Sequence, residues 1–301
     1  MADWGVCCTL KSPVDQMLAF VAHHHALGAA HLWLHFDDPD DPAHAVAQRL
    51  PDVTAIRCDR DWWQQISGGR PGKHQVRQSS NIAALYAKAP LPWLLHADVD
   101  EFLLADSPMP TLLDAVSPSA PFIRARPWEA LHEPDLPDDI QTASHFRAAL
   151  PGARNAGNRE LVFGQFAALL PNGALSHAAG KCLFRTGIDG LIPRIHGAFR
   201  DGQRVEAGDF HPALALLHFH AQDRTAWFAR LAFRLRRGAY QFNPPMADFL
   251  ASATQDQLDE FYVAVQSARP ETLAKLAQIG ALRAERLDLR AKVAALTRGN
   301  R

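Results

Sequence analysis

The sequence has no long apolar run and few cysteines, and these absences argue against several classes of protein. No apolar stretch approaches the roughly 20 residues that a membrane-spanning helix needs, so we expect no transmembrane segment. The amino terminus lacks a basic stretch followed by an apolar one, so we predict no signal peptide and a cytoplasmic location. The cysteines, at positions 7, 8, 58 and 182, include no C-x-x-C pair, which argues against structural zinc and against a disulfide framework.

Neither sign of charge is in excess. The 31 Lys and Arg residues nearly cancel the 32 Asp and Glu residues, which leaves a net charge of −1. This balance does not favour nucleic acid as a partner, because such binding draws on a basic surface. Hydrophobic residues make up 48% of the 301 residues, so we expect a globular protein with a sizeable core.

The first 60 residues alternate between two kinds of apolar pattern. Short apolar runs at residues 5–10, 31–36 and 53–58 predict strands, and helical spacing predicts helices at 14–27 and 43–50. Strands separated by helices are typical of a parallel sheet with crossover helices. A nucleotidyl- or phosphotransferase on a related α/β scaffold would normally have a glycine-rich phosphate loop after the first strand. Here Lys11-Ser12-Pro13 follows that strand, which argues against such an enzyme.

Weaker patterns follow along the chain. Residues 59–73, with their glycines and prolines, predict a long loop, and residues 74–88 predict a helix. Further strands are predicted at 122–125, 163–170, 181–184 and 214–219. Helices are predicted at 225–240 and 246–267.

The most informative stretch is PWLLHADVDEFLL at residues 92–104, in which three carboxylates follow an apolar strand. In open α/β sheets, ligands bind beyond the carboxyl ends of strands. Alternation along a strand would put Asp98 and Asp100 on one side and turn Val99 to the core. Two carboxylates about 7 Å apart repel each other and require a compensating cation. Oxygen ligands of this kind suit Mg²⁺ or Mn²⁺.

Four other segments accompany ADVDEFL (97–103) in a recognisable order. They are TLKSP (9–13), HFDDPDD (35–41), RQSSNIAALY (77–86) and HFHAQDRTAWFARLAFRLRRG (218–238). Together these segments resemble glycosyltransferases of the GT-A fold, most of all the family 2-like and family 92-like groups. Gly180-Lys181 and His196 match a Gly-Lys pair and a histidine of those groups. The sequence departs from them at Ser12-Pro13, where Asn-Glu is usual, and at Arg234, where Lys is more usual.

The resemblance implies a GT-A α/β fold with a mostly parallel sheet flanked by helices and a C-terminal helical extension. It implies transfer, with inversion, from a nucleotide diphosphate sugar to a glycan or other hydroxyl acceptor, with Mn²⁺ or Mg²⁺ as cofactor. By the same resemblance, Asp98 contacts the ribose or a metal-bound water, and Asp100 binds the metal directly. His218 is the candidate third metal ligand or phosphate contact. The other candidates for donor binding are Lys11, Asp38, Gln78 and Lys181.

The residue that deprotonates the acceptor is left open by the sequence. Glu101 lies next to the predicted metal site, and further carboxylates lie in the loop-rich middle of the chain. These are Glu129, Glu133, Asp135 and Glu160.

The last part of the chain carries Leu282, Leu289 and Leu296 at intervals of seven. We predict a transferase domain over residues 1–240 and a helical extension over 241–301. A helix over 271–296 would either pack on its own domain or form a short coiled coil that makes a homo-oligomer. The alternative function is therefore a non-catalytic nucleotide-binding or scaffold protein that oligomerises through this helix.

Overall fold

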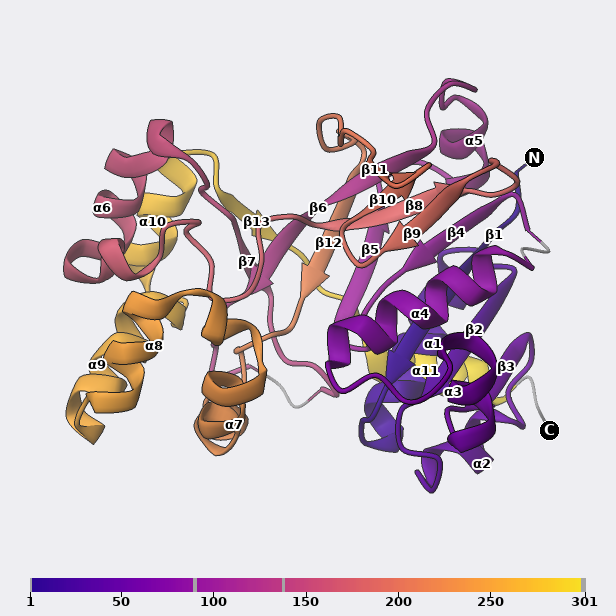
Figure 1. Cartoon of the computed structure of the whole chain (residues 1–301). Helices are drawn as coiled ribbons and strands as arrows, with labels where there is room; N and C mark the ends of the chain where they lie inside the picture. The colour runs from indigo at the N-terminus through magenta and orange to yellow at the C-terminus, as the bar shows by residue number, and fades with distance from the viewer. Residues whose placement is uncertain (1, 89–90, 137–138, 299–301) are drawn as a thin grey trace. The chain divides into compact units, whose positions relative to one another are not determined.

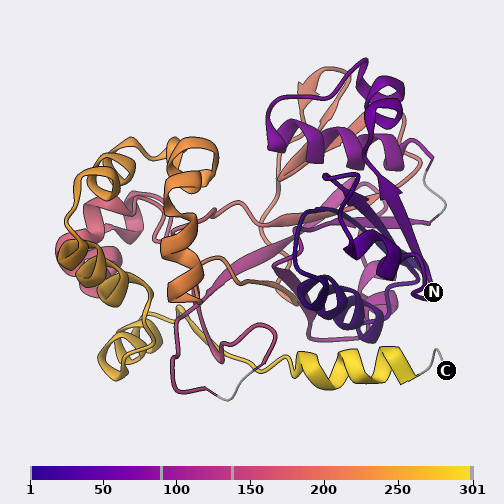
Figure 2. The ribbon, with the colours of Figure 1, turned by 90° about the horizontal axis from the view of Figure 1, so that it is seen from below.

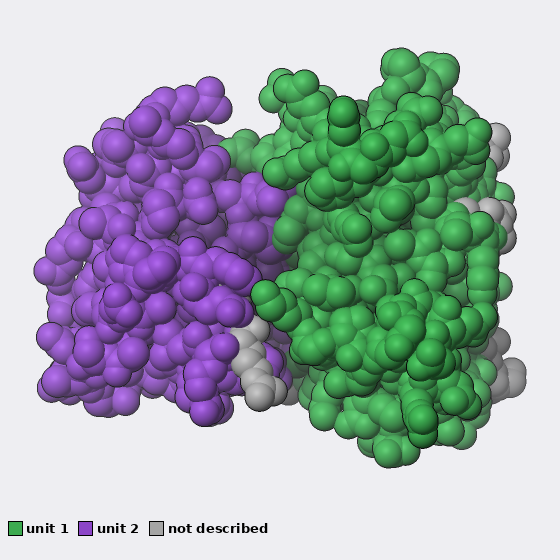
Figure 3. Space-filling model, viewed as in Figure 1, with its two compact units in different colours: residues 1–126, 180–216, 288–301 green, residues 127–179, 217–287 purple. Residues whose placement is uncertain are grey.

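The computed structural model describes residues 2–88, 91–136 and 139–298. The chain divides into two compact units (Figure 3). Unit 1 comprises residues 1–126, 180–216 and 288–301, and unit 2 comprises residues 127–179 and 217–287. Each unit is assembled from separate segments of the chain. The boundary at residue 240 between a transferase domain and a helical extension is a separate expectation from the sequence, and it stays a prediction.

Unit 1 contains the alternating strands and helices that the amino-terminal pattern predicted (Figure 1). Its first elements are β1 (Trp4–Leu10), α1 (Val14–Ala26), β2 (His31–Phe36), α2 (Ala43–Ala47), β3 (Val53–Arg57), α3 (Arg60–Ser67), α4 (His74–Tyr86), β4 (Trp93–His96), β5 (Glu101–Ala105) and α5 (Met109–Asp114). Later segments add β8 (Lys181–Arg185), β9 (Leu191–Arg194), β10 (Gly197–Arg200), β11 (Gln203–Arg204) and α11 (Leu289–Arg298). Two strands carry residues of both units, β6 (Phe122–Ala130) and β12 (Leu214–His218).

The sheet of unit 1 has a parallel core in the order β3-β2-β1-β4, continued by the antiparallel strands β8 and β6. The predicted α/β fold is therefore confirmed, with helices flanking the parallel strands. Strand β1 has β2 on one side and β4 on the other, so the chain reverses its direction of winding at β1. Ligands bind in α/β sheets at such a switch point, beyond the carboxyl ends of the strands.

Both faces of this sheet are covered because its central strand is apolar on both sides. Alternate residues of β1, beginning with Trp4, pack in one cluster with Phe20 of α1. Cys7, which points the other way, packs in a second cluster with Ile82 of α4. Helix α11 lies along α1 (Figure 2) and adds Leu296 to the first cluster.

Unit 2 has its own core, built mostly from helices. Its elements are β7 (His145–Ala148), η1 (Ala153–Asn155), α6 (Ala156–Phe163), η2 (Gly164–Leu169), α7 (Arg224–Arg237), η3 (Ala239–Phe242), α8 (Pro244–Ser252), α9 (Gln255–Gln266), α10 (Pro270–Gln278) and β13 (Leu282–Ala284). Strand β7 pairs antiparallel with β6 and with β13. The buried rings of Trp227, Tyr240 and Tyr262 lie in this core, and the Trp227 indole N–H donates to the Tyr240 hydroxyl at 2.8 Å.

Four expectations about elements were wrong. The helix expected at 246–267 is divided into α8 and α9, with residues 253–254 between them. Residues 59–73, expected as a loop, contain α3, because Asp59 caps its amino end by accepting from the Trp62 N–H at 2.9 Å and Gly68 closes it at φ 68°. The strand expected at 163–170 is the helical turn η2. The helix expected over 271–296 is divided into α10, β13 and α11.

The break in the carboxyl-terminal segment removes the coiled-coil interpretation. Leu282 lies on a strand, whereas Leu289 is fully buried at the start of α11. The interval of seven residues therefore does not mark one helical stripe. No helix among the described residues is long and apolar enough to span a bilayer.

Candidate functional site

The three carboxylates predicted to end a strand lie instead around a tight turn between β4 and β5. The Glu101 N–H donates to the Asp98 carbonyl at 2.9 Å, and the Asp98 N–H donates to Oε2 of Glu101 at 2.8 Å. Asp98 and Asp100 are half-buried residues of this turn, and Glu101 is the fully buried first residue of β5. The strand-alternation argument for placing both aspartates on one side was therefore wrong, although the cluster does lie at the carboxyl end of β4.

Lys181 supplies the cation for two of these carboxylates. Its ammonium nitrogen lies 2.8 Å from Oδ2 of Asp98 and 3.3 Å from Oε2 of Glu101, and its side chain has no exposed surface. Burial alone would lower the pKa of Lys181, but the charges of Asp98 and Glu101 outweigh it, so the pKa is raised above its ordinary value. A direct contact between Lys181 and the donor does not fit this position, because the Lys181 side chain has no exposed surface.

The position of Lys181 follows from the antiparallel pairing of β8 with β4. Leu183 pairs with Leu95, so the start of β8 lies beside the end of β4. The preceding residue, Gly180, has φ 68°, and a Cβ atom there would lie 2.1 Å from the Ala125 carbonyl oxygen. Only glycine fits at position 180 without moving β6, the strand that contains Ala125.

Gln78 completes the contacts of Asp98. It lies on α4, and its side-chain amide donates to Oδ1 of Asp98. The two oxygens of Asp98 therefore face Gln78 and Lys181 respectively. The structure thus brings together three of the predicted donor-binding residues, Gln78, Asp98 and Lys181, and the predicted base Glu101.

A second charged group lies at the end of β2. Arg77, which precedes Gln78 on α4, forms a bidentate pair with Asp37, with N–O distances of 2.6 and 2.7 Å. Arg70 adds a contact to Asp37 at 3.1 Å. Burial raises the pKa of Asp37, but Arg77 outweighs it and the pKa is lowered. The sequence interpretation missed Asp37 and Arg77. The available signal was that Asp37 is the first residue after the buried strand β2.

A cavity of about 530 Å³ opens beside this group. Its lining includes Asp37, Cys58, Trp63 and Arg70, together with two predicted donor-binding residues, Lys11 and Asp38. Lys11 and Asp38 form an exposed ion pair at 2.9 Å. Arg77 and Gln78 are consecutive on α4 and contact Asp37 and Asp98 respectively, so one helix joins the cavity to the carboxylate turn.

Glu129, a predicted catalytic residue, is a buried residue of unit 2. It pairs with Arg147 at 2.6 Å and accepts from the N–H groups of Leu175 and Ser176 at 3.0 and 2.6 Å. Burial raises the pKa of Glu129, but Arg147 and these donors outweigh it, so the pKa is lowered. A carboxylate held in this way is a weak base, and the geometry favours a structural role.

Glu133, the other carboxylate predicted from the middle of the chain, also lies in unit 2. It accepts from the N–H groups of Ser144 and His145 at 2.7 and 2.9 Å and from the Ser144 hydroxyl at 2.8 Å. Its pKa is lowered because these hydrogen bonds outweigh the effect of burial. Glu133 therefore fixes the start of β7.

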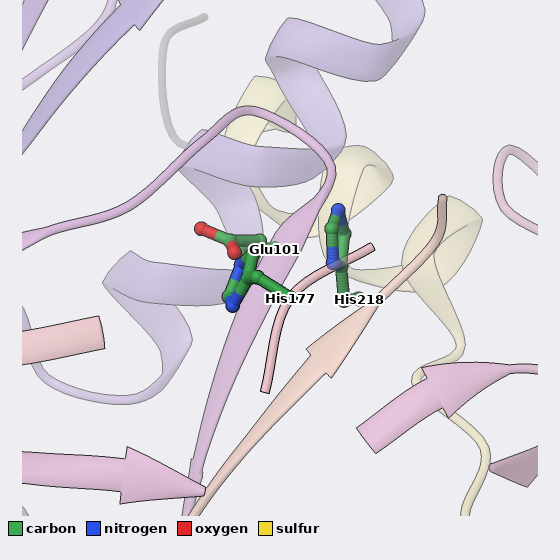
Figure 4. A group of neighbouring side chains, drawn as sticks. All are labelled: Glu101, His177 and His218. Atoms are coloured by element: carbon green, nitrogen blue, oxygen red, sulfur yellow. The ribbon is translucent and has the colours of Figure 1, made fainter. Parts of the chain in front are cut away.

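His218, the predicted third metal ligand, is a buried residue of unit 2 at the end of β12. Its ring centroid lies 5.3 Å from that of His177 and 5.3 Å from that of His220. Figure 4 labels both His177 and His218, and each of these unit 2 residues has an imidazole ring that can offer a nitrogen to a ligand. His220 contacts the Tyr240 hydroxyl at 3.2 Å, and burial, with the charge of Arg234, lowers the pKa of His220.

We expect the replacement Glu129→Gln to lower the free energy of unfolding by about 1–3 kcal/mol at pH 7, because Arg147 loses its charged partner. The folded-state pKa of Glu129 is lowered, so its stabilising effect is complete above the ordinary value of 4.5 and decreases as the pH falls below it. The difference between the two proteins should therefore shrink on acidification. Urea titrations from pH 7 to pH 3 measure this. A catalytic Glu129 would instead give loss of turnover with unchanged stability.

Comparison with known proteins identifies no family for this chain. No protein-family model matches the sequence, and no curated protein does. Among solved structures, the chain is similar to S. aureus TarS 1–349 in complex with UDP-GlcNAc, with 11% identity over 99% of this chain and 90% of that one and a TM-score of 0.38. It is also similar to HddC from Yersinia pseudotuberculosis, with 9% identity over 72% and 77% of the two chains and a TM-score of 0.29. Similarity with such low TM-scores and sequence identities supports no conclusion about function.

Proposed function

We propose that this protein transfers a sugar from a nucleoside diphosphate donor to a hydroxyl acceptor. One observation carries the proposal: the parallel strands β1, β2 and β4 end at a common edge of the sheet. Lys11 and Asp37, which follow β1 and β2, line the cavity, and Asp98 lies in the turn after β4. Among α/β folds, this is the edge at which nucleotides bind.

The cavity suits a nucleoside. Its volume of about 530 Å³ falls within the range of about 300–1,000 Å³ usual for small-molecule sites. Pro39, which is partly exposed in the lining, offers apolar surface for a base, and the carboxylates of Asp37 and Asp38 can accept from ribose hydroxyls. Lys11 and Arg70 provide positive charge for the diphosphate. The resemblance to family 2-like and family 92-like transferases is consistent with this assignment.

Asp98 is a poor direct ligand for a divalent ion, because the ammonium of Lys181 lies at its Oδ2 and repels a second cation. Asp100, in the same turn, has a hard carboxylate of the kind that Mg²⁺ and Mn²⁺ prefer, and the resemblance makes it the direct ligand. An ion held there would supply positive charge against a leaving diphosphate. His218 as a further ligand stays a prediction.

The roles of the chain's own residues follow from these contacts. Lys181, Gln78 and Glu101 fix the turn, so that Asp98 keeps one orientation and needs no reorganisation when substrate binds. In the transfer, the bond from the sugar carbon to the diphosphate breaks, and the diphosphate keeps the electron pair. The acceptor oxygen bonds to that carbon from the opposite face and loses its proton to a carboxylate. Inversion is therefore the expected outcome.

The alternative of a scaffold protein draws less support. It rested on one continuous helix over residues 271–296, and that segment forms α10, β13 and α11. It also gives no reason for a buried Lys181 between two carboxylates, since an apolar side chain would fill the same space with less desolvation.

We expect UDP, GDP or CDP to stabilise the protein, and only one of them to do so strongly. A ligand at about one hundred times its Kd adds about 2.7 kcal/mol to the free energy of unfolding. Thermal unfolding with and without Mn²⁺ measures this. Asp38→Asn should weaken the effect because Asp38 lines the cavity, whereas Asp40→Asn should not, because Asp40 is exposed and outside the lining. No stabilisation by any nucleotide would contradict the proposed function.

A further inference from the structure

Unit 1 has a second groove, which α4 lines with residues other than Arg77 and Gln78, the residues that contact Asp37 and Asp98. It measures about 450 Å³ and lies between α4 and the three-stranded sheet β11-β10-β9. Gln75, Val76 and Ser79 line it from the helix, and Arg194, Phe199 and Arg204 line it from the sheet. Val76 and Phe199 are 44% and 37% exposed. Exposed apolar side chains on both walls indicate that the groove takes an apolar group.

The charged side chains that line this groove are all positive. Its lining contains two arginines and no carboxylate. Arg194 lies over the ring of Phe199, with 5.7 Å from its guanidinium carbon to the ring centroid. Within the described part of the chain, neither Arg194 nor Arg204 forms a salt bridge. Two exposed guanidinium groups on one wall favour an anionic ligand, because each can donate a pair of hydrogen bonds to phosphate or carboxylate oxygens.

The groove is joined to the carboxylate turn by two short routes. Ser79, which lines the groove, follows Gln78, whose amide donates to Asp98. His196, also in the lining, contacts the Gly180 carbonyl at 2.7 Å through Nδ1, and Gly180 precedes Lys181. A molecule in this groove would therefore lie against the same elements that hold Asp98 in place.

We propose that this groove binds the acceptor, and that the acceptor carries a phosphate group beside an apolar portion. The proposal rests on the proposed function, which requires an acceptor next to the donor site. Phosphate fits better than carboxylate, since a phosphate monoester carries a charge of about −1.5 to −2 at pH 7, which two arginines balance. The apolar portion lies against Val76 and Phe199.

Phenyl phosphate is a suitable probe, because it joins a phosphate to an aromatic ring. We expect it to bind the protein in ligand-observed NMR titrations, and to bind more tightly than benzoate, which carries one charge. Arg194→Gln and Arg204→Gln should each weaken binding roughly tenfold, as expected when a charge-assisted pair of hydrogen bonds is lost. Arg200→Gln is the matched control, since Arg200 is an exposed arginine of β10 outside the groove.

A saturating nucleotide, chosen as the one among UDP, GDP and CDP that stabilises the protein most, separates this inference from the proposed function. Phenyl phosphate should still bind when this nucleotide fills the 530 Å³ cavity, because the two linings share no residue. Complete displacement by the nucleotide, equal binding of benzoate, or unchanged affinity in both groove variants would overturn the inference while nucleotide binding stands. Absence of binding of all three nucleotides with intact binding of phenyl phosphate would instead contradict the donor assignment. Thermal unfolding checks that the exposed substitutions leave the fold intact.

Discussion

Lys181→Met is expected to lower the free energy of unfolding by about 3–5 kcal/mol, which is the usual effect of removing one partner from a buried ion pair. The ammonium of Lys181 lies against two carboxylates, and the side chains of Lys181 and Glu101 have no exposed surface. Methionine fills much of the same volume, so the loss measures uncompensated charge rather than a cavity. Urea unfolding at pH 7 gives the value.

The matched control is Lys11→Met. The change in side chain is the same, but the Lys11–Asp38 pair is exposed and screened by solvent, so little change in stability is expected. The double replacement Lys181→Met with Glu101→Gln removes one buried charge of each sign and should recover part of the loss. Equal effects of the two lysine replacements, or no recovery in the double variant, would show that Lys181 does not balance these carboxylates.

The pairing of Lys181 with Asp98 and Glu101 shows where the sequence interpretation succeeded and where it failed. The apolar strand 93–96 and the acidic residues after it were sufficient to locate the end of β4 at a sheet edge. They also led to the prediction of a compensating cation for Asp98 and Asp100, taken to be a divalent metal ion, whereas Asp98 has a side-chain cation beside it. The partner in the structure is Lys181, 83 residues further along the chain. Sequence periodicity predicts helices and strands, but it does not predict the pairing of β8 with β4 that brings Lys181 beside Asp98.

Other failures have similar physical reasons. Asp59 and Gly68 are the capping residues of α3, but the glycines and prolines around them obscured a helix of eight residues. Leu282, Leu289 and Leu296 keep an interval of seven by coincidence, because Gly280 at φ 65° ends the helical turn before them. Glu129 and Glu133 were chosen because they lie in the loop-rich middle of the chain. In the structure Glu129 pairs with the distant Arg147, and backbone N–H groups hold Glu133. Local pattern therefore predicted the elements of unit 1 well and the partners of single polar residues poorly.

The contrast between Asp98 and Asp100 leads to the largest expected effect on turnover. Asp98 is held by Gln78 and Lys181, so Asp98→Asn should lower stability as well as activity, since Lys181 loses one of its two charged partners. Asp100 lies half-buried in the same turn and is the proposed metal ligand. Asp100→Asn should lower donor turnover by about 10²–10³-fold at a fixed Mn²⁺ concentration, the size of effect seen when one group that stabilises developing charge is removed.

Three measurements on the Asp100 variant decide the assignment. Its thermal unfolding temperature without ligand should stay near that of the parent protein, which separates it from Asp98→Asn. Raising Mn²⁺ should restore part of its turnover, because a weakened site fills at higher metal concentration, whereas no such rescue is expected for Asp98→Asn. Asp189→Asn, at an exposed aspartate of unit 1 outside both cavities, is the control for loss of one charge. Full turnover in Asp100→Asn at every Mn²⁺ concentration would remove the metal from Asp100.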